Sequence, residues 1–373
     1  MFAHGVQAFA QSVTVKTQSP ASSMSHMSDM DALPQEFICE GASVPAESRV
    51  QIIEPRDVPL GGIRAMNVRR TIPHRERRTV GAWCFLDHFG PNDVRATGGM
   101  HVPPHPHTGL QTVSWLFQGE VEHRDSLGSH QLVAPGEMNL MTAGHGISHS
   151  EVSTDRDTTL HGVQLWVVLP EKFRDTQPSF SHTVAKTVEV DAGAGLTATL
   201  IVFMGELAEV KADAEGLSEI VGAEIVLPAS GELELPARSD FEYGVLLDTG
   251  AAALNATDIP LHALAVVDAG SGVLRLTAGA AGARLVLIGG VPLNERFVMW
   301  WNFIGTNHAD VVAARESWMS DVVERNASDY GLSPEVDADT DSEMKDARFF
   351  DVLGFEGPPL PAPVMPASNL KPR

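Results

Sequence analysis

Two short patterns in this sequence place metal-ligating side chains two residues apart. His105 and His107 form the first pair, and His149 and Glu151 form the second. On a β-strand, side chains at positions i and i+2 point to the same face. Two such strands lying side by side would therefore aim three imidazoles and one carboxylate at a single point.

This set of side chains suits a divalent transition metal. Imidazole binds iron, zinc, copper and nickel, and an added carboxylate favours iron or manganese. Four such ligands leave positions of an octahedral metal open for water, oxygen or a substrate. The alternative is that these are surface histidines on polar strands. Two pairs, both in β-type sequence with turn glycines, favour the metal site.

Further polar residues near these motifs are candidates for the surroundings of the metal. His123 and Asp125 are again two residues apart and would orient a ligand imidazole, as metal-bound histidines usually require. A cross-strand polar pair is the alternative for these two. His101 and His145 would line the pocket or overhang its mouth, with solvent-exposed loop histidines as the alternative.

The elements that must position these residues are short strands joined by turns. The chain of 373 residues contains 33 Gly and 24 Pro, which suits such an organisation. Alternation over 110–126 predicts a hairpin with its turn at 118–120, and 161–170 predicts a central strand. A second series of strands follows in the same rhythm, which indicates one architecture used twice. That second half has no comparable ligand pair, so we expect it to lack metal.

The sequence predicts a helix over 306–327, after the second series of strands. Thr306 or Asn307 can cap its start. Its apolar residues at helical spacing are Val311, Ala314, Trp318 and Val322.

The two ends of the chain differ from the body in composition. Residues 1–45 are predicted to be a disordered leader, because the start is rich in Ser, Ala, Gln and Met without apolar periodicity. Residues 328–373 form an acidic and then proline-rich tail. Phe349, Phe350 and Phe355 indicate that the proline-rich part begins by docking on the body. A free polyproline ligand for another protein is the alternative.

Charge and cysteine content exclude several classes of function. The net charge of −22 argues against direct nucleic-acid binding and against docking on anionic membranes. No apolar run approaches the length of a membrane span. Cys39 and Cys84 lie far apart and indicate no disulfide framework, so we expect a cytoplasmic, reducing location.

The motifs resemble those of the cupin superfamily and, within it, the pirin family. HPHTGLQTVSWLFQGEVEHRDSLG resembles the first pirin motif, PGEMNLMTAGHGISHSE the second, and HGVQLWVVLP the strand that follows. The likeness runs from about residue 50 to about 326. Ordinary cupins lack the second motif, which makes the resemblance specific to pirins.

The resemblance implies an all-β fold of two tandem cupin (jelly-roll β-barrel) domains with a short C-terminal helix and an extended tail. The expected divisions are a metal-binding cupin domain over 46–175, a metal-free cupin domain over 176–305, then the helix and the tail. It also implies Fe(II), or another divalent transition metal, held by His105, His107, His149 and Glu151. Pirins usually carry Glu where this chain has Gln111, a change that would alter the charge of the pocket rather than empty it.

The resemblance implies two kinds of function. One is quercetin 2,3-dioxygenation of a small aromatic flavonol, with Glu151 as ligand and base. The alternative is a non-enzymatic, redox-sensing regulator that binds a protein partner through a surface that depends on its iron. A storage or scaffold bicupin is a third class, disfavoured because all four ligand types are present.

Overall fold

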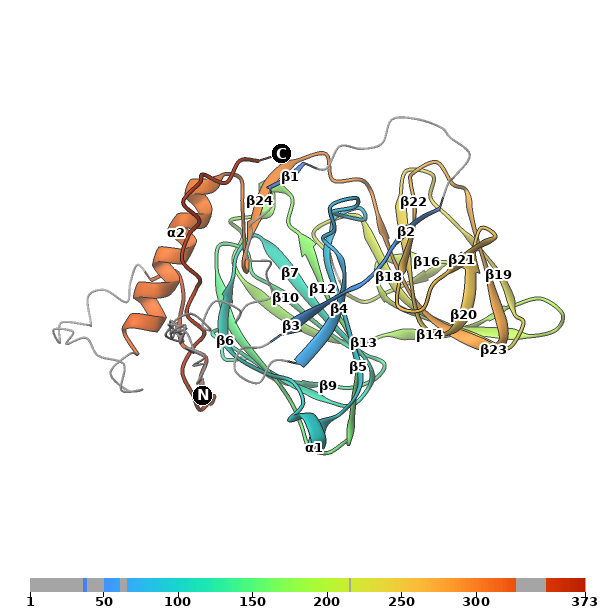
Figure 1. Cartoon of the computed structure of the whole chain (residues 1–373), viewed down its shortest axis with the longest axis horizontal. Helices are drawn as coiled ribbons and strands as arrows, with labels where there is room; N and C mark the ends of the chain where they lie inside the picture. The colour runs from blue at the N-terminus through green and yellow to red at the C-terminus, as the bar shows by residue number, and fades with distance from the viewer. Residues whose placement is uncertain (1–35, 39–49, 61–65, 215, 327–346, 373) are drawn as a thin grey trace, which may run out of the picture.

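The computed structural model describes residues 36–38, 50–60, 66–214, 216–326 and 347–372. Its strands build two barrels side by side, with one principal helix near the C-terminus (Figure 1). The predicted all-β fold of two barrels with a short C-terminal helix is confirmed. No helix among the described residues has the length and apolar character needed to cross a bilayer.

Two sheets form the first barrel. The larger contains, in spatial order, β13 (Ser179–Val184), β10 (Glu137–Thr142), β7 (Leu110–Gln118), β12 (Thr159–Val168), β5 (Trp83–Asp93), β4 (Met66–Ile72) and β3 (Arg56–Leu60). The smaller contains β6 (His101–His107), β11 (Ile147–Ser153), β8 (Val121–Asp125) and β9 (His130–Val133). The predicted central strand is β12, which lies between β7 and β5. Both strands with ligand pairs, β6 and β11, are neighbours in the smaller sheet.

The predicted hairpin over 110–126 is wrong. Strand β7 pairs with β10 and β12, whereas β8 pairs with β11 and β9. The turn between β7 and β8 therefore carries the chain from one sheet of the barrel to the other. Alternation identified both strands, but alternation says nothing about which strands become neighbours.

The second barrel is built mainly from one nine-stranded sheet. Its path runs through β14 (Lys186–Asp191), β15 (Thr197–Met204), β18 (Ile220–Leu227), β23 (Val273–Gly290), β20 (Glu242–Leu254), β22 (Leu264–Val267) and β2 (Gln51–Ile53). Strand β19 (Glu232–Pro236) pairs with β23, and β21 (Thr257–Ile259) pairs with β20. A small hairpin joins β16 (Glu206–Leu207) to β17 (Val210–Lys211).

The two barrels exchange strands across the predicted domain boundary. Strand β2 precedes the first barrel in sequence but pairs with β22 of the second, whereas β13 lies beyond residue 175 and pairs with β10 of the first. The boundaries themselves stay a prediction. Within the predicted leader, β1 (Glu36–Ile38) pairs with β24 (Arg296–Trp300), and the rest of the leader lies outside the described residues.

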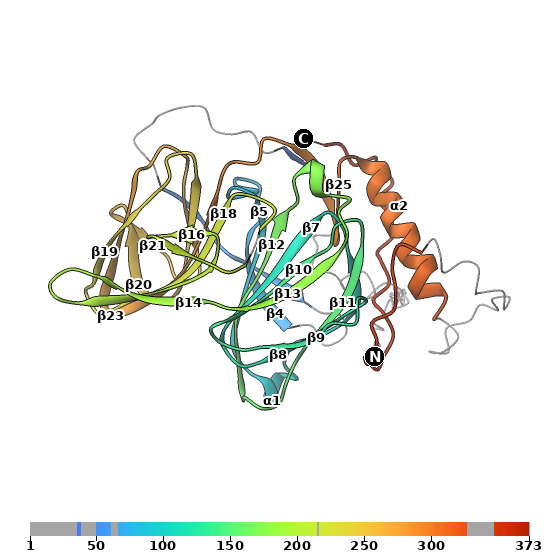
Figure 2. The same ribbon diagram turned by 180° about the vertical axis from the view of Figure 1, so that it is seen from behind.

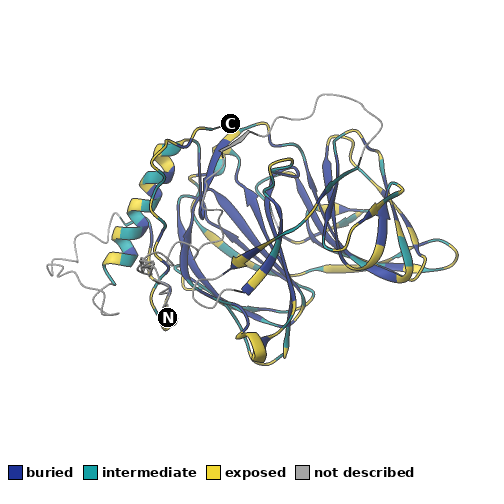
Figure 3. Ribbon diagram, viewed as in Figure 1, coloured by how far each residue is buried: buried dark blue, intermediate teal, exposed yellow. Residues whose placement is uncertain are grey.

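An apolar layer joins the barrels. Side chains from the larger sheet of the first barrel, among them Trp83, Val163 and Leu165, pack against Leu246 and Val286 of the second. A separate core fills the second barrel. Figure 3 shows the buried strands of both barrels in dark blue. Burial on this scale makes the relative position of the barrels part of the fold.

The principal helix is α2 (His308–Trp318), which continues as a π-helical turn over Met319–Glu324. Asn307 is its N-cap and shares a capping box with Asp310, so one of the two predicted caps is confirmed. The predicted apolar face is buried: Val311, Ala314, Trp318 and Val322. Shorter elements are α1 (Val94–Thr97), a 3₁₀ turn at Glu171–Phe173 and β25 (Phe303–Gly305), which pairs with β24. Helix α2 covers the side of the first barrel remote from the second (Figures 1 and 2).

The described part of the tail, 347–372, runs along α2 and docks on the first barrel. Trp318 Nε1 donates to the carbonyl of Leu360, and the Leu360 amide donates to the carbonyl of Pro104 on β6. Leu360 is buried within the proline-rich run, so the alternative of a free polyproline ligand is wrong for these residues. The predicted acidic stretch lies outside the described residues up to residue 346.

The three phenylalanines of the tail are not equivalent, which allows a matched test of its docking. Phe349 is fully buried, whereas Phe350 is 40% exposed and Phe355 is half-buried. We expect Phe349→Ala to lower the free energy of unfolding by about 3–5 kcal/mol, because it removes a buried ring and leaves a cavity. Phe350→Ala should change it by less than about 0.5 kcal/mol. Urea denaturation of both variants measures these changes. An equally small change in both variants would show that the ring of Phe349 is not packed.

Candidate metal centre

The pairing of β6 with β11 brings the two ligand pairs together. His105 lies directly opposite His149, and His107 lies opposite Ile147. The register shifts between His149 and Glu151, as it does at a β-bulge. Such an irregularity re-aims side chains locally and is common beside functional sites.

Three buried imidazoles converge inside the first barrel. Ligand-type atoms of His105, His107 and His149 all lie within 4.8 Å of one another. Nε2 of His107 is 3.1 Å from Nε2 of His149. The ring centroids of His105 and His149 are 4.4 Å apart. Separations of this size match those between neighbouring ligands of one metal ion, whose bonds are roughly 2.0–2.2 Å long.

Glu151 joins this cluster through His149. It forms a second group with His123 and His149, whose ligand-type atoms also lie within 4.8 Å of one another, so His149 belongs to both groups. Ser114 Oγ donates to Glu151 Oε1 at 3.1 Å, and Gln164 Nε2 donates to the same oxygen at 3.3 Å. The larger sheet, through β7 and β12, thereby holds a carboxylate that the smaller sheet supplies.

Burial controls the protonation of these groups. It lowers the pKa of His105 to about 4, and it lowers the pKa of His107 and of His149 well below the usual value, helped by the neighbouring imidazoles. Burial also raises the pKa of Glu151, against the opposing effects of His123, Ser114 and Gln164. The three imidazoles are therefore neutral at pH 7, which is the form that binds metals.

A backbone carbonyl orients the ring of His105. Its Nδ1 is 2.9 Å from the carbonyl oxygen of Pro103, which can only accept a hydrogen bond. Nδ1 therefore carries the proton in the neutral ring, and Nε2 keeps its lone pair. This is the tautomer that a metal bound at Nε2 requires.

His123 and Asp125 lie next to the ligands. Nδ1 of His123 is 3.3 Å from Nδ1 of His149, and its Nε2 is 3.1 Å from Asp125 Oδ2. Burial raises the pKa of Asp125, but hydrogen bonds from His123 and Ser129 outweigh that and hold the pKa below its usual range. Phe180 stacks on the His123 ring at 4.4 Å between centroids. Asp125 is thus a carboxylate that orients His123 beside the cluster.

The other three predicted pocket residues have contacts elsewhere. His101 lies at the start of β6, with its ring centroid 5.6 Å from that of Phe355 in the tail. Nδ1 of His145 is 3.2 Å from the carbonyl of Thr176. Gln111 Nε2 donates to Thr142 Oγ1 at 2.9 Å. Strand alternation puts Gln111 on the face of β7 opposite Ser114, away from Glu151.

A second buried group that could hold a metal lies between the barrels, and spacing in the sequence did not indicate it. It consists of His88 on β5, His161 on β12 and Asp248 on β20. None of the three has another potential ligand two residues away in its strand. Their proximity depends on how the barrels pack, so no local pattern could have found it.

Two family models match separate parts of the chain. Residues 63–167 match the family model described as Pirin, and residues 222–323 match the one described as Pirin C-terminal cupin domain. The first range contains all four predicted ligands. The second range lies in the second barrel and extends through α2.

Individual proteins are also similar to this chain in sequence and in structure. A protein of Pseudomonas aeruginosa, provisionally named as a quercetin 2,3-dioxygenase, is 37% identical over 86% of this chain and 92% of its own length. A pirin-like protein of Caulobacter vibrioides is 32% identical over 71% of this chain and 92% of its own. The crystal structure of a quercetin 2,3-dioxygenase from Acinetobacter baumannii is similar with a TM-score of 0.75 and 34% identity, covering 87% of this chain and 97% of that one.

Proposed function

This chain belongs to the pirin family of bicupins, and from that membership we propose that it is an iron-dependent dioxygenase of the quercetin 2,3-dioxygenase type. The single observation that carries the proposal is the convergence of His105, His107 and His149 with the buried carboxylate of Glu151 in the first barrel. The names of the similar Pseudomonas and Acinetobacter proteins support the choice of reaction. The substrate would be a flavonol or a related small, flat aromatic molecule.

Four side chains would hold the metal: His105, His107, His149 and Glu151. Their chemistry fits a divalent ion, because burial keeps the imidazoles neutral and three imidazoles with one carboxylate suit iron. A cation would also offset the cost of burying the carboxylate of Glu151, whose described partners are neutral side chains and His123. Iron bound there would supply Lewis-acid and redox chemistry for a reaction with O₂.

Glu151 would be the base of the reaction. Burial raises its pKa, so its carboxylate takes up a proton more readily than an exposed glutamate does. The proton would come from the hydroxyl group of the flavonol. Ser114 and Gln164 donate hydrogen bonds to Oε1 and thereby hold the carboxylate in one orientation while the proton moves.

Aromatic side chains keep the imidazoles in place. The ring of Trp166 meets His107 edge-on at 5.0 Å between centroids, and Phe180 stacks on His123. Trp166 is itself stacked on Phe85 at 4.0 Å, which ties this wall to the strand β5. A wall of buried rings also limits the water that can reach the ligands.

A cytoplasmic location is part of the same proposal. Cys39 and Cys84 lie far apart in the sequence and indicate no disulfide framework, which accords with a reducing compartment. The net charge of −22 argues against direct nucleic-acid binding.

Flavonol turnover in air tests the proposed activity. We expect iron-loaded protein to remove the flavonol absorbance band with matching O₂ uptake, and metal-free protein to do neither. The comparison uses the same preparation before and after removal of the metal with a chelator. Absence of O₂ uptake with every flavonol, together with different binding of a protein partner by the Fe(II) and Fe(III) forms, would establish the regulatory alternative instead.

A further inference from the structure

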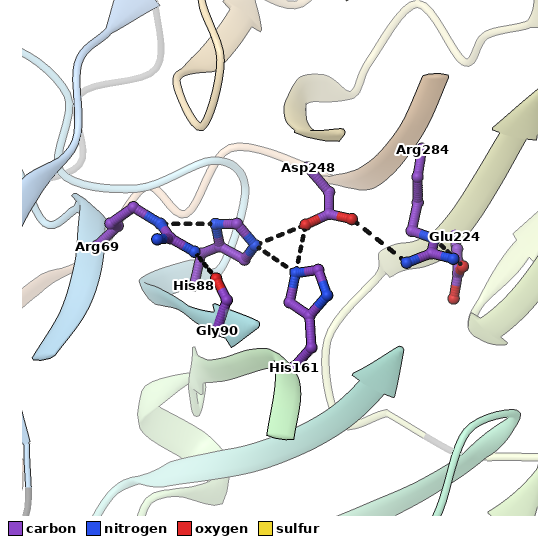
Figure 4. A network of polar contacts seen from close by, with 7 residues as sticks. All are labelled: Arg69, His88, Gly90, His161, Glu224, Asp248 and Arg284. Carbon is purple, nitrogen blue, oxygen red and sulfur yellow. Dashed lines mark hydrogen bonds and ion pairs between the residues drawn. The ribbon is translucent and has the colours of Figure 1, made fainter. Parts of the chain in front are cut away.

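A polar cluster interrupts the apolar layer between the two barrels (Figure 4). Asp248 Oδ1 lies 2.7 Å from Nε2 of His88 and 2.7 Å from Nε2 of His161. The two Nε2 atoms are 3.3 Å apart. His88 and Asp248 are fully buried and His161 is 5% exposed, so these are strong interactions in a site that excludes water.

The cluster bridges the barrels because its members lie on facing strands. His88 and Leu86 share one face of β5 by the alternation of side chains along a strand. Asp248 lies where the register of β20 with β23 shifts, two residues after Leu246, and its carboxylate contacts His88 and His161. Leu86 and Leu246 both belong to the apolar layer between the barrels. His88 and His161 therefore reach from the first barrel toward Asp248 of the second.

Two imidazoles and one carboxylate are also a recognised set of ligands for Fe(II). A hydrogen bond from outside the cluster argues against a metal here. Arg69 Nε donates to Nδ1 of His88 at 3.2 Å, and Arg69 also donates to the carbonyl of Gly90. A guanidinium has no acceptor, so Nδ1 of His88 must carry the lone pair and Nε2 must carry the proton. A metal at Nε2 requires the opposite tautomer.

The observed hydrogen bonds form a continuous series of donors and acceptors without a metal. Arg69 donates to His88, His88 donates to Asp248, and His161 donates to the same carboxylate oxygen. We propose that Arg69, His88, His161 and Asp248 form a proton-dependent lock between the barrels, closed while His88 is neutral and opened when His88 takes up a second proton. We call these four residues the inter-barrel lock.

A second proton on His88 would remove the hydrogen bond that Arg69 donates to it. It would occupy Nδ1, where Arg69 Nε already donates, so the two cationic groups would face each other without an acceptor between them. Charged and titratable groups approach His88 from every side. They are Arg69 on β4, His161 on β12, Asp248 on β20, His262 at 5.0 Å between ring centroids, and, behind them, Asp57, Glu224 and Arg284.

The direction of the pH effect follows from these surroundings. Burial, assisted by Arg69 and His161 and opposed by Asp248, lowers the pKa of His88 from 6.5 to about 4. Burial raises the pKa of Asp248, but the hydrogen bonds from His161 and His88 outweigh it and hold the pKa well below its usual range. Between pH 6.5 and about 4 the unfolded chain binds a proton at His88 that the folded chain does not. The lock is therefore fully stabilising above pH 6.5 and weakens as the pH falls toward 4.

A neutral replacement of His88 tests the lock. The amide of His88→Gln can donate to Asp248 and accept from Arg69, but it does not titrate. We expect the variant and the wild type to have similar Tm values at pH 7.5. Between pH 7.5 and pH 4.5 the Tm of the wild type should fall by roughly 5 °C more than the Tm of the variant. The reason is that only the wild type has a side chain at this position that takes up a proton on unfolding at pH 4.5. Parallel loss of Tm in both proteins would overturn the proposal.

The tautomer of His88 gives an independent readout that needs no variant. Nitrogen NMR of the wild type should show a neutral ring protonated at Nε2 at pH 6, remaining so until the pH approaches 4. A ring protonated at Nδ1, or doubly protonated at pH 6, would contradict the lock. This measurement stands even if His88→Gln fails to fold.

Zinc titration separates the lock from a second metal site. In a His149→Ala background, which removes a proposed ligand of the first barrel, the lock should take up no zinc. Additional replacement of Arg69 by Met removes the donor to Nδ1 and should create zinc binding that depends on Asp248. One equivalent of zinc bound in the His149→Ala protein, and lost on adding Asp248→Asn, would show that the cluster is a metal site.

Discussion

His149→Ala is expected to abolish metal binding in the first barrel. His149 belongs to both groups of converging ligand atoms, with His105 and His107 on one side and His123 and Glu151 on the other. Its loss should lower affinity by more than the roughly 10–100-fold caused by losing a residue that only orients a ligand. Metal analysis after dialysis should fall from about one iron per chain to near zero. Flavonol-dependent O₂ uptake should disappear with it.

Two further histidines serve as matched controls for this prediction. His182 lies on β13 of the same barrel and contacts Asn139, so His182→Ala should retain the metal. His123→Ala removes the ring that lies 3.3 Å from His149 and should weaken binding by roughly 10–100-fold without abolishing it. Full metal content in both His105→Ala and His149→Ala would rule out the proposed centre.

Glu151→Gln is expected to separate catalysis from metal binding. The amide keeps the size of the side chain and a ligand oxygen, but it removes the basic carboxylate. If Glu151 accepts the flavonol proton, the chemical step should slow by roughly 10²–10⁴-fold, which is the usual contribution of a general base. Iron content should fall much less. Single-turnover kinetics with a flavonol, measured alongside iron analysis, distinguishes the two effects.

Gln111→Glu provides the contrast for this variant. It restores the residue usual in pirins, but Gln111 faces away from Glu151 and bonds Thr142. We therefore expect iron content and rate close to those of the wild type. A Glu151→Gln protein that retains both iron and full rate would show that another group takes the proton.

The sequence by itself indicated the two pairs of candidate ligands and, through the resemblance of its motifs, the pirin family. The candidate ligands follow from a local rule, because side chains two residues apart share a strand face, and three imidazoles with one carboxylate are a set that suits iron. The capped helix over 308–318 was predictable for the same reason, since Asn307 and the apolar spacing act within a few residues.

The tertiary structure alone decided which strands become neighbours and what lies between them. The predicted hairpin was wrong because β7 and β8 belong to different sheets. Gln111 faces away from Glu151 because the other face of β7, which carries Ser114, is the one that packs toward Glu151. Phe349 and Phe350 are adjacent in sequence, yet only the first is buried. The inter-barrel lock joins His88 to Asp248, 160 residues apart, across two packed sheets. The alternation of apolar residues indicates which face of a strand is buried. Which other strands pack against that face depends on contacts between residues far apart in the sequence, and no local pattern predicts those contacts.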